Sequence, residues 1–141
     1  MAGVLVVDTS VLIAMERGTL PADALRQVLP GARLVASSIT VSELLHGYHR
    51  ARTKSQRAAR ERFIASVLAE LEIVSFDLRL AREHAALWAG LAEHGQVIGP
   101  YDLMIAATAL AYRVPLATLN DREFSKIEGL EVLSLRPFLR E

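Results

Sequence analysis

Apolar residues along this chain fall into short continuous runs, which are separated by longer segments with a helical repeat. Five of the runs are rich in aliphatic and β-branched residues, which favour strands at this length. The predicted strands are Val4–Val7, Leu34–Ala36, Ile73–Phe76, Leu116–Leu119 and Val132–Leu135.

The clearest helical segment is Asp77–His94. Its apolar residues recur at steps of three and four, the spacing that places side chains on one face of a helix. They are Leu78, Ala81, Ala85, Trp88 and Ala92. Gly95 follows them, and glycine is typical of the position that ends a helix. We expect Trp88, like Phe63 and the methionines, to pack in the core or between helices.

Strands that alternate with helices point to a parallel sheet covered on both faces. Right-handed crossovers then make a doubly wound arrangement the simplest solution. We therefore predict one domain over residues 1–141, with an α/β/α sandwich fold of the Rossmann-like class and a five-stranded, mainly parallel sheet. In such sheets the functional site lies beyond the carboxyl ends of the strands, near the point where the strand order reverses.

Composition limits the choice of function. The chain has 141 residues, 52% of them hydrophobic, which is enough for one domain with its own core. It carries 16 basic and 16 acidic residues, so any contact with a nucleic acid must be local. The absence of cysteine excludes disulfides and thiolate metal sites. The apolar segment Leu103–Tyr112 is too short to cross a bilayer, and we expect a cytoplasmic protein without a membrane partner.

Acidic residues from four separate segments are expected at the same rim of this sheet. Asp8 directly follows the first strand, and Glu43 lies in the helix after the second. Asp121 and Glu123 follow the fourth strand. Asp102 opens the helix that leads into the fourth strand, and because that helix runs antiparallel to the strand, its first turn lies at the same edge.

Each acid also has a local interpretation that needs no chemistry. Asp8 begins a good helix N-cap, and residues 40–43 have the form of a capping box in which Glu43 reaches back to the Thr40 amide. Asp102 complements the dipole of a helix that starts at Pro100, and residues 120–121 are typical of a turn. Independent caps, however, have no reason to gather at one edge of one sheet.

A cluster of carboxylates is unfavourable without a cation. Two carboxylates about 4 Å apart repel by several kcal/mol at the effective dielectric of a partly buried site. Hard oxygen ligands and the absence of cysteine favour Mg²⁺, with Mn²⁺ as a substitute, over Zn²⁺. His46 and His49, three apart on a predicted helix, form the alternative zinc pair, but the sequence shows no third ligand for them.

Four segments that carry these acids resemble the motifs of one family. They are residues 6–13 (VVDTSVLI), 37–44 (SSITVSEL), 99–107 (GPYDLMIAA) and 118–124 (TLNDREF). In this order and at this spacing they are similar to the four motifs of PIN-domain ribonucleases. The resemblance covers the chain from end to end and extends to the VapC-like toxins of bacterial toxin–antitoxin pairs.

The resemblance implies roles for individual residues. The acids that would hold the metal are Asp8, Glu43 and Asp102. The fourth acid varies in the family, and here Glu123 is the preferred choice with Asp121 as the alternative. The hydroxyl of Ser10 or Thr118 would help to hold a water of the metal or, equally, cap the backbone.

The resemblance also implies an activity and partners. The expected activity is metal-dependent hydrolysis of an RNA phosphodiester that leaves a 5′-phosphate, with a structured RNA such as tRNA or rRNA as the target. The expected partners are this RNA, a VapB-like antitoxin and a second copy of the chain. Candidate residues for an antitoxin groove, each equally expected in the core, are Leu12, Met15, Leu44, Leu45 and Tyr48.

A basic run follows the second motif. Its members are Arg50, Arg52, Lys54, Arg57, Arg60 and Arg62. The run predicts either an arm that tracks RNA phosphates, for which the first four are the candidates, or a solvated helix face. Aromatic residues stand only at its ends, so the run itself does not indicate base stacking.

Two other classes of protein compete with a nuclease. A non-catalytic PIN-like module that binds RNA or protein predicts a degraded set of acids, whereas the set here is complete. A phosphatase of the haloacid dehalogenase type needs a second acid two residues after the first, where Ser10 stands. A response-regulator receiver needs a lysine after its fifth strand, and residues 136–141 contain none.

Overall fold

The computed structural model describes residues 3–140, which form a five-stranded sheet of strand order β3-β2-β1-β4-β5. Its strands are β1 (Val4–Val7), β2 (Arg33–Ser37), β3 (Glu72–Val74), β4 (Leu116–Thr118) and β5 (Val132–Ser134). Every neighbouring pair is parallel, and Val6 pairs with both Val35 and Leu116. The strand order reverses at β1 and β4, so their carboxyl ends flank the expected site.

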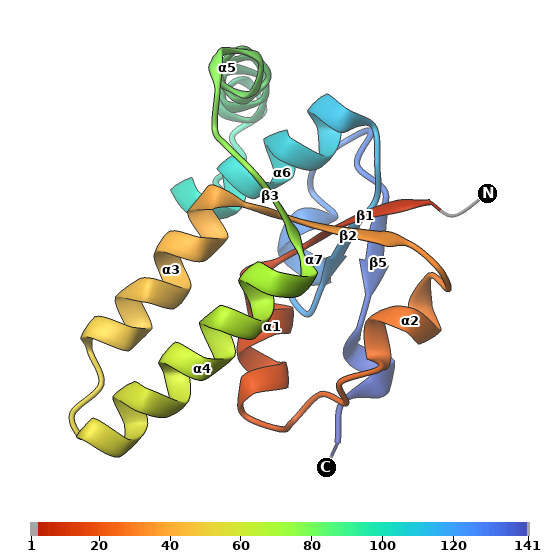
Figure 1. The fold of residues 1–141 in the computed structure, drawn as a ribbon. Helices are drawn as coiled ribbons and strands as arrows, with labels where there is room; N and C mark the ends of the chain where they lie inside the picture. Colours follow the sequence, from red (N-terminus) through yellow and green to blue (C-terminus); the bar gives the residue numbers. More distant parts are fainter. Residues whose placement is uncertain (1–2, 141) are drawn as a thin grey trace.

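Helices lie on both faces of the sheet (Figure 1). Their bounds are α1 (Thr9–Glu16), α2 (Ala24–Val28), α3 (Ser38–His49), α4 (Lys54–Glu70), α5 (Leu78–Glu93), α6 (Pro100–Tyr112) and α7 (Asp121–Phe124), with a 3₁₀ turn η1 at Arg136–Phe138. Helices α1 to α4 share one apolar core, and α5, α6 and α7 share the other. Helix α5 packs on α6, on the side away from the sheet (Figure 1).

Strand β1 contributes to both cores. Leu5 and Val7 belong to the core under α1 to α4, and Val6 belongs to the core on the opposite face. All three side chains are fully buried. Because successive side chains of a strand point to opposite faces, a continuous apolar run is what a doubly covered strand requires. The predicted doubly wound α/β/α sandwich is confirmed, and its sheet is entirely parallel.

Most predicted elements are confirmed, with changes at their ends. The third strand covers Glu72–Val74, so Phe76 lies outside it, and β4 and β5 each end one residue earlier than predicted. The predicted helix over 77–94 is α5, with Asp77 as its N-cap. The carboxylate of Asp77 accepts a hydrogen bond from the Leu80 amide at 3.0 Å. Gly95 follows with φ +68°, a left-handed conformation that suits glycine.

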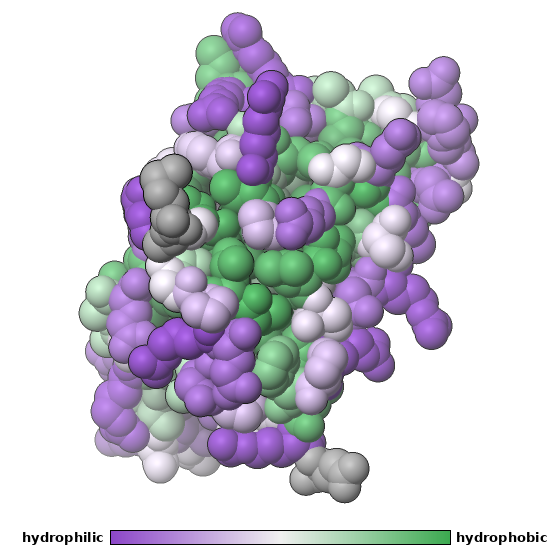
Figure 2. Space-filling model, turned by 90° about the vertical axis from the view of Figure 1, so that its right-hand side faces the viewer, coloured by the Kyte–Doolittle hydropathy of each residue, from purple (hydrophilic) through white to green (hydrophobic). Residues whose placement is uncertain are grey.

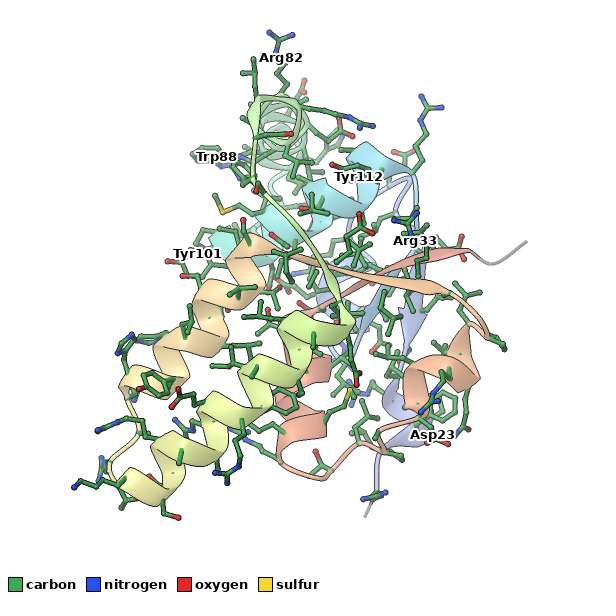
Figure 3. The ribbon with its side chains drawn as sticks, viewed as in Figure 1. Asp23, Arg33, Arg82, Trp88, Tyr101 and Tyr112 are labelled. Carbon is green, nitrogen blue, oxygen red and sulfur yellow. The ribbon has the colours of Figure 1, made fainter. Side chains whose placement is uncertain are left out.

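The prediction that Trp88 packs in the core or between helices was wrong. Leu80 and Leu91 are the buried residues of α5, whereas Leu78 and Trp88 of the apolar stripe are 66% and 62% exposed. Figure 3 shows the Trp88 side chain pointing away from the body of the molecule. Helical spacing identifies an apolar stripe but not the surface that covers it, and α6 covers the neighbouring stripe instead. Phe63, by contrast, packs against the core as predicted.

The surface on the side of β5 and α2 is mixed. Figure 2 shows apolar side chains gathered in the middle of this face and hydrophilic side chains at its margins. Strand β5 forms this edge of the sheet, and its Val132 and Leu133 are only partly buried. Between residues 3 and 140, no helix combines the length and the apolar character needed to cross a bilayer.

Candidate active site

Asp8 lies where β1 ends, at the reversal point of the sheet. Its side chain is buried, with 3% of the residue exposed. The Ser10 hydroxyl donates to Oδ2 of Asp8 at 2.6 Å, and the Thr118 hydroxyl, from the end of β4, donates to the same oxygen at 2.8 Å. The first turn of α1 and the end of β4 therefore hold one oxygen of this carboxylate.

Burial raises the pKa of Asp8 above its usual value, and the hydroxyls of Ser10 and Thr118 partly oppose that rise. Asp8 occupies the N-cap position of α1, but its side chain makes no capping hydrogen bond. The backbone amides of Thr9 and Ser10 lie near enough to lower its pKa slightly without satisfying the geometry of a cap. The carboxylate is thus oriented by hydroxyls rather than used as a helix cap.

Glu43 faces the same rim from α3. The Thr9 hydroxyl donates to Oε1 of Glu43 at 2.7 Å and lies 2.9 Å from the Thr40 hydroxyl. Burial raises the pKa of Glu43, the Thr9 hydrogen bond lowers it, and the charge of Asp8 raises it again. The electrostatic effect of Asp8 shows that the two carboxylates act on each other across the gap between α1 and α3.

The capping box predicted for residues 40–43 was wrong. Helix α3 begins at Ser38, and its N-cap is Ser37, whose hydroxyl accepts from the Ile39 amide at 3.1 Å. Thr40 is therefore the third residue of the helix and not its N-cap. The Glu43 carboxylate is left to turn outward to Thr9.

Asp102 lies in the first turn of α6, after Gly99 and Pro100. Burial raises its pKa to about 6, and the charges of Asp8, Glu43 and Glu123 add to that rise in this order. Three of the four predicted acids therefore raise the pKa of the fourth. The helix N-terminus stabilises an anion at this position, but its effect does not offset burial and three like charges.

The fourth acid comes from α7, at the carboxyl end of β4. The charge of Glu123 raises the pKa of Asp102, and Glu123 also pairs with Lys126 at 3.0 Å. Asp121 has a buried Oδ1 that has no hydrogen-bond partner within residues 3–140. The electrostatics favour Glu123 as the acid that faces Asp102, while Asp121 keeps an oxygen available for an ion or a water.

Both hydroxyls predicted near the site have a double role. Ser10 donates to Asp8 and accepts from the Leu119 amide at 3.2 Å. Thr118 donates to Asp8 and accepts from the Asn120 amide at 2.8 Å. Of the two alternatives left open by the sequence, the backbone cap is confirmed, and each hydroxyl also orients a carboxylate.

The sequence did not identify Thr9 and Thr40 as part of the site. Thr9 is the residue through which α1 reaches Glu43 on α3, and both threonines are buried. A buried hydroxyl needs a partner, and here the partner is an acid of the site. The position of Thr9 directly after Asp8 was the only signal in the sequence.

The donor set is chemically suited to a hard divalent ion. The charges of Asp8, Glu43 and Glu123 all reach Asp102. The hydroxyls engage only Oδ2 of Asp8 and Oε1 of Glu43, so the other oxygen of each carries no side-chain hydrogen bond from the described residues. Within residues 3–140, no three Asp, Glu or His side chains already surround one point, His46 and His49 included.

The predicted basic arm is divided between two roles. The Arg57 side chain donates to the Ala51 carbonyl at 3.2 Å, and the Arg60 side chain donates to the Gly47 carbonyl. These contacts fasten α4 to the end of α3. Arg50, Arg52 and Lys54 are exposed, and within the described residues their side chains donate no hydrogen bond.

A doubly wound parallel sheet with clustered acids at its reversal point defines a class of α/β proteins with a site for phosphate or metal chemistry. The PIN domain model matches residues 5–130, and this chain belongs to that family. The predicted family is therefore confirmed, and the four motifs that indicated it all lie within the matched residues.

Relatives give the resemblance more detail. The chain is 34% identical to a protein named Ribonuclease VapC from Rickettsia bellii over 131 residues, which cover 93% of this chain and 96% of the relative. It is 32% identical to the tRNA(fMet)-specific endonuclease VapC of Salmonella typhimurium, covering 72% and 74% of the two chains. A chain of the Rickettsia felis VapBC2 crystal structure, bound to a promoter DNA fragment, superposes with a TM-score of 0.82 at 25% identity, covering 93% and 98%.

Proposed function

We propose that this chain is a metal-dependent endoribonuclease and the toxin of a VapBC-type toxin–antitoxin pair. The observation that carries the proposal is the group of acids around Asp102, whose pKa rises to about 6. Repulsion among four ionised carboxylates destabilises the folded state, and a divalent cation bound between them offsets this repulsion. The relatives named as ribonucleases support the reaction class.

Each residue of the site then has a part. Asp8, Glu43 and Asp102 would hold Mg²⁺, or Mn²⁺ in its place, with Glu123 as the fourth acid and Asp121 as its alternative. When bound, the ion polarises the phosphoryl oxygens of the RNA and stabilises the leaving oxygen. Ser10 and Thr118 hold one oxygen of Asp8, and Thr9 holds one oxygen of Glu43, so the second oxygen of each would be available to the ion. Glu43 and Glu123 would complete the site or orient the attacking water.

The test is cleavage of total cellular RNA by the purified chain with Mg²⁺, with Mn²⁺ and with chelator. We expect discrete fragments that carry a 5′-phosphate and require metal. Asp8→Asn and Asp102→Asn should each reduce cleavage by at least a hundredfold. Asp23→Asn is the matched control, because Asp23 is exposed and its side chain makes no capping hydrogen bond to α2 (Figure 3). No cleavage by folded, antitoxin-free protein would favour the non-catalytic RNA- or protein-binding module instead.

A structured RNA, tRNA or rRNA, is the proposed target. The name of the Salmonella relative, a tRNA(fMet)-specific endonuclease, supports a tRNA as the first substrate to examine. Mapping the ends of the fragments from total RNA identifies the target without assuming it.

The proposed antitoxin has an apolar groove available to it. A groove of about 520 Å³ between α1, α2, α4 and β2 is lined by Leu12, Met15, Leu25, Leu34 and Phe63, among others. A helix from a VapB-like partner would bury its apolar face there. The solved relatives with a bound antitoxin support such a partner. Of the other predicted groove residues, Leu44 lines a different groove, Leu45 is exposed and Tyr48 packs against the core.

A second copy of the chain is the other proposed partner. The uncovered stripe of α5 holds Leu78, Ala81, Ala85, Trp88 and Ala92, with no charge among them. An exposed apolar stripe on a helix marks an interaction surface. A two-fold axis across α5 would place the stripe against its own copy, which is how identical surfaces cover each other in a dimer.

A further inference from the structure

A second groove begins at the acidic site and leads away from it. Its volume is about 870 Å³, and its walls come from α1, α3, α4 and the first turn of α6. Glu43 lies in its wall, so the groove is continuous with the acids. Any chain seated in it passes directly beside the proposed reaction centre.

The groove carries unpaired positive charge. Arg17, at the end of α1, and Arg50, at the end of α3, both line it and are both exposed. Within residues 3–140 neither forms a salt bridge, although Glu16, which precedes Arg17, also lines the groove. Arg60 also lines the groove, but its side chain is held by the Gly47 carbonyl. Two exposed cations thus line a groove that ends at a cluster of anions.

An aromatic ring stands at the acidic end of the groove. Tyr101 lines it, directly precedes Asp102 on α6, and is 55% exposed (Figure 3). At this exposure the ring lacks most of the apolar contacts that stabilise a buried tyrosine. Its exposed position beside the acids suits stacking of a flat ligand.

We propose that this groove binds a single-stranded segment of RNA next to the scissile phosphate, with Arg17 and Arg50 on backbone phosphates and Tyr101 stacked on a base. The inference rests on the proposed nuclease function and names residues that position its substrate. Proteins that bind single-stranded RNA with little preference for base sequence combine two elements, a groove with positive charge and an aromatic side chain on which a base stacks. An apolar partner helix has the groove between α1, α2 and α4 instead, whose lining is mostly apolar.

The experiment measures binding of a fluorescein-labelled twelve-nucleotide oligouridylate by anisotropy, with the full-length Asp8→Asn chain in chelator. The RNA is checked on a gel and must stay intact. Arg17→Gln and Arg50→Gln are each expected to weaken binding severalfold and to lower the slope of log K against log salt by about 0.7. Tyr101→Ala is expected to weaken binding about tenfold, and Tyr101→Phe, which keeps the ring, to leave it within twofold.

Arg82→Gln is the matched control, since it removes the same charge from the far side of α5 (Figure 3). Equal affinity for all four variants and the control would overturn the groove proposal. So would an undetectable affinity of the parent, or equal losses for Arg82→Gln and Arg17→Gln. Cleavage of total RNA by the wild-type chain is scored separately, so the nuclease function can stand while the groove proposal fails, and the reverse.

Discussion

Burial and the negative charges of neighbouring acids both disfavour the ionised form of the Asp102 carboxyl group. Its pKa of about 6 compares with 3.8 for the free side chain. Between these two values the folded chain keeps a proton that the unfolded chain releases. The free energy of unfolding of the metal-free protein must therefore fall as the pH rises through this window, and the loss is complete above pH 6.

We predict a loss of about 1 to 2 kcal/mol in the metal-free protein between about pH 4 and pH 7, after allowing for solvent screening of a half-buried group. Urea denaturation in chelator measures it. Asp102→Asn should flatten this part of the pH profile, and Mg²⁺ at neutral pH should stabilise the wild-type chain but not the variant. The control Asp23→Asn should keep the wild-type slope. A profile that Asp102→Asn leaves unchanged would show that Asp102 is not the titrating group.

At the scale of elements, the site depends on how α1 and α3 are joined. Both helices start at the carboxyl end of a strand, α1 after β1 and α3 after β2. The Thr9 hydroxyl crosses between them to Glu43 and Thr40. Without this contact, Glu43 would lie at the rim with no fixed orientation.

Thr9→Val removes the hydroxyl and keeps the shape of the side chain. We predict a fall in kcat of about tenfold, because residues that orient a metal ligand commonly contribute this much. The free energy of unfolding should fall by about 1 to 2 kcal/mol, because Thr40 and Glu43 lose a buried partner. Thr9→Ser keeps the hydroxyl and should restore kcat. Equal losses of kcat in both variants, measured with stability on the same preparations, would contradict a positioning role.

At the scale of the whole molecule, α5 is the element whose surface is left uncovered. It packs on α6, with Leu80 and Leu91 buried, and the stripe that contains Leu78 and Trp88 faces outward. The acidic site, the groove lined by Arg17 and Arg50, and the groove between α1, α2 and α4 all lie on other elements. Pairing through α5 therefore leaves substrate and antitoxin surfaces accessible.

Trp88→Glu tests the proposed pairing. A charge at the centre of a self-complementary apolar face meets its own copy across the two-fold axis, and this like-charge contact disfavours the dimer. We predict that sedimentation velocity shows a dimer for the wild-type chain and a monomer for Trp88→Glu. Leu139→Glu is the control, because it adds the same charge at an exposed leucine outside α5. A wild-type monomer, or a Trp88→Glu dimer, would refute pairing through this stripe.

The local pattern of the sequence was sufficient for much of this architecture. Apolar runs predicted the strands, and the order of elements predicted a doubly wound parallel sheet. Because parallel strands end at one edge, the positions of Asp8, Glu43 and Asp102 along the chain were enough to expect them at one rim. The charges of Asp8, Glu43 and Glu123 each raise the pKa of Asp102, so these acids lie within electrostatic reach of it.

Other features were decided only by tertiary structure. The stripe of α5 that is covered depends on where α6 lies, and helical spacing carries no information about that surface. The hydroxyls that hold the acids come from far along the chain, since Thr118 and Asp8 are separated by 110 positions and Glu43 and Thr9 by 34. A hydrogen bond acts over about 3 Å, so its partners are defined by packing and not by distance in sequence. The sequence by itself determined which acids reach the rim, and the fold decided how each is held there and what surrounds it.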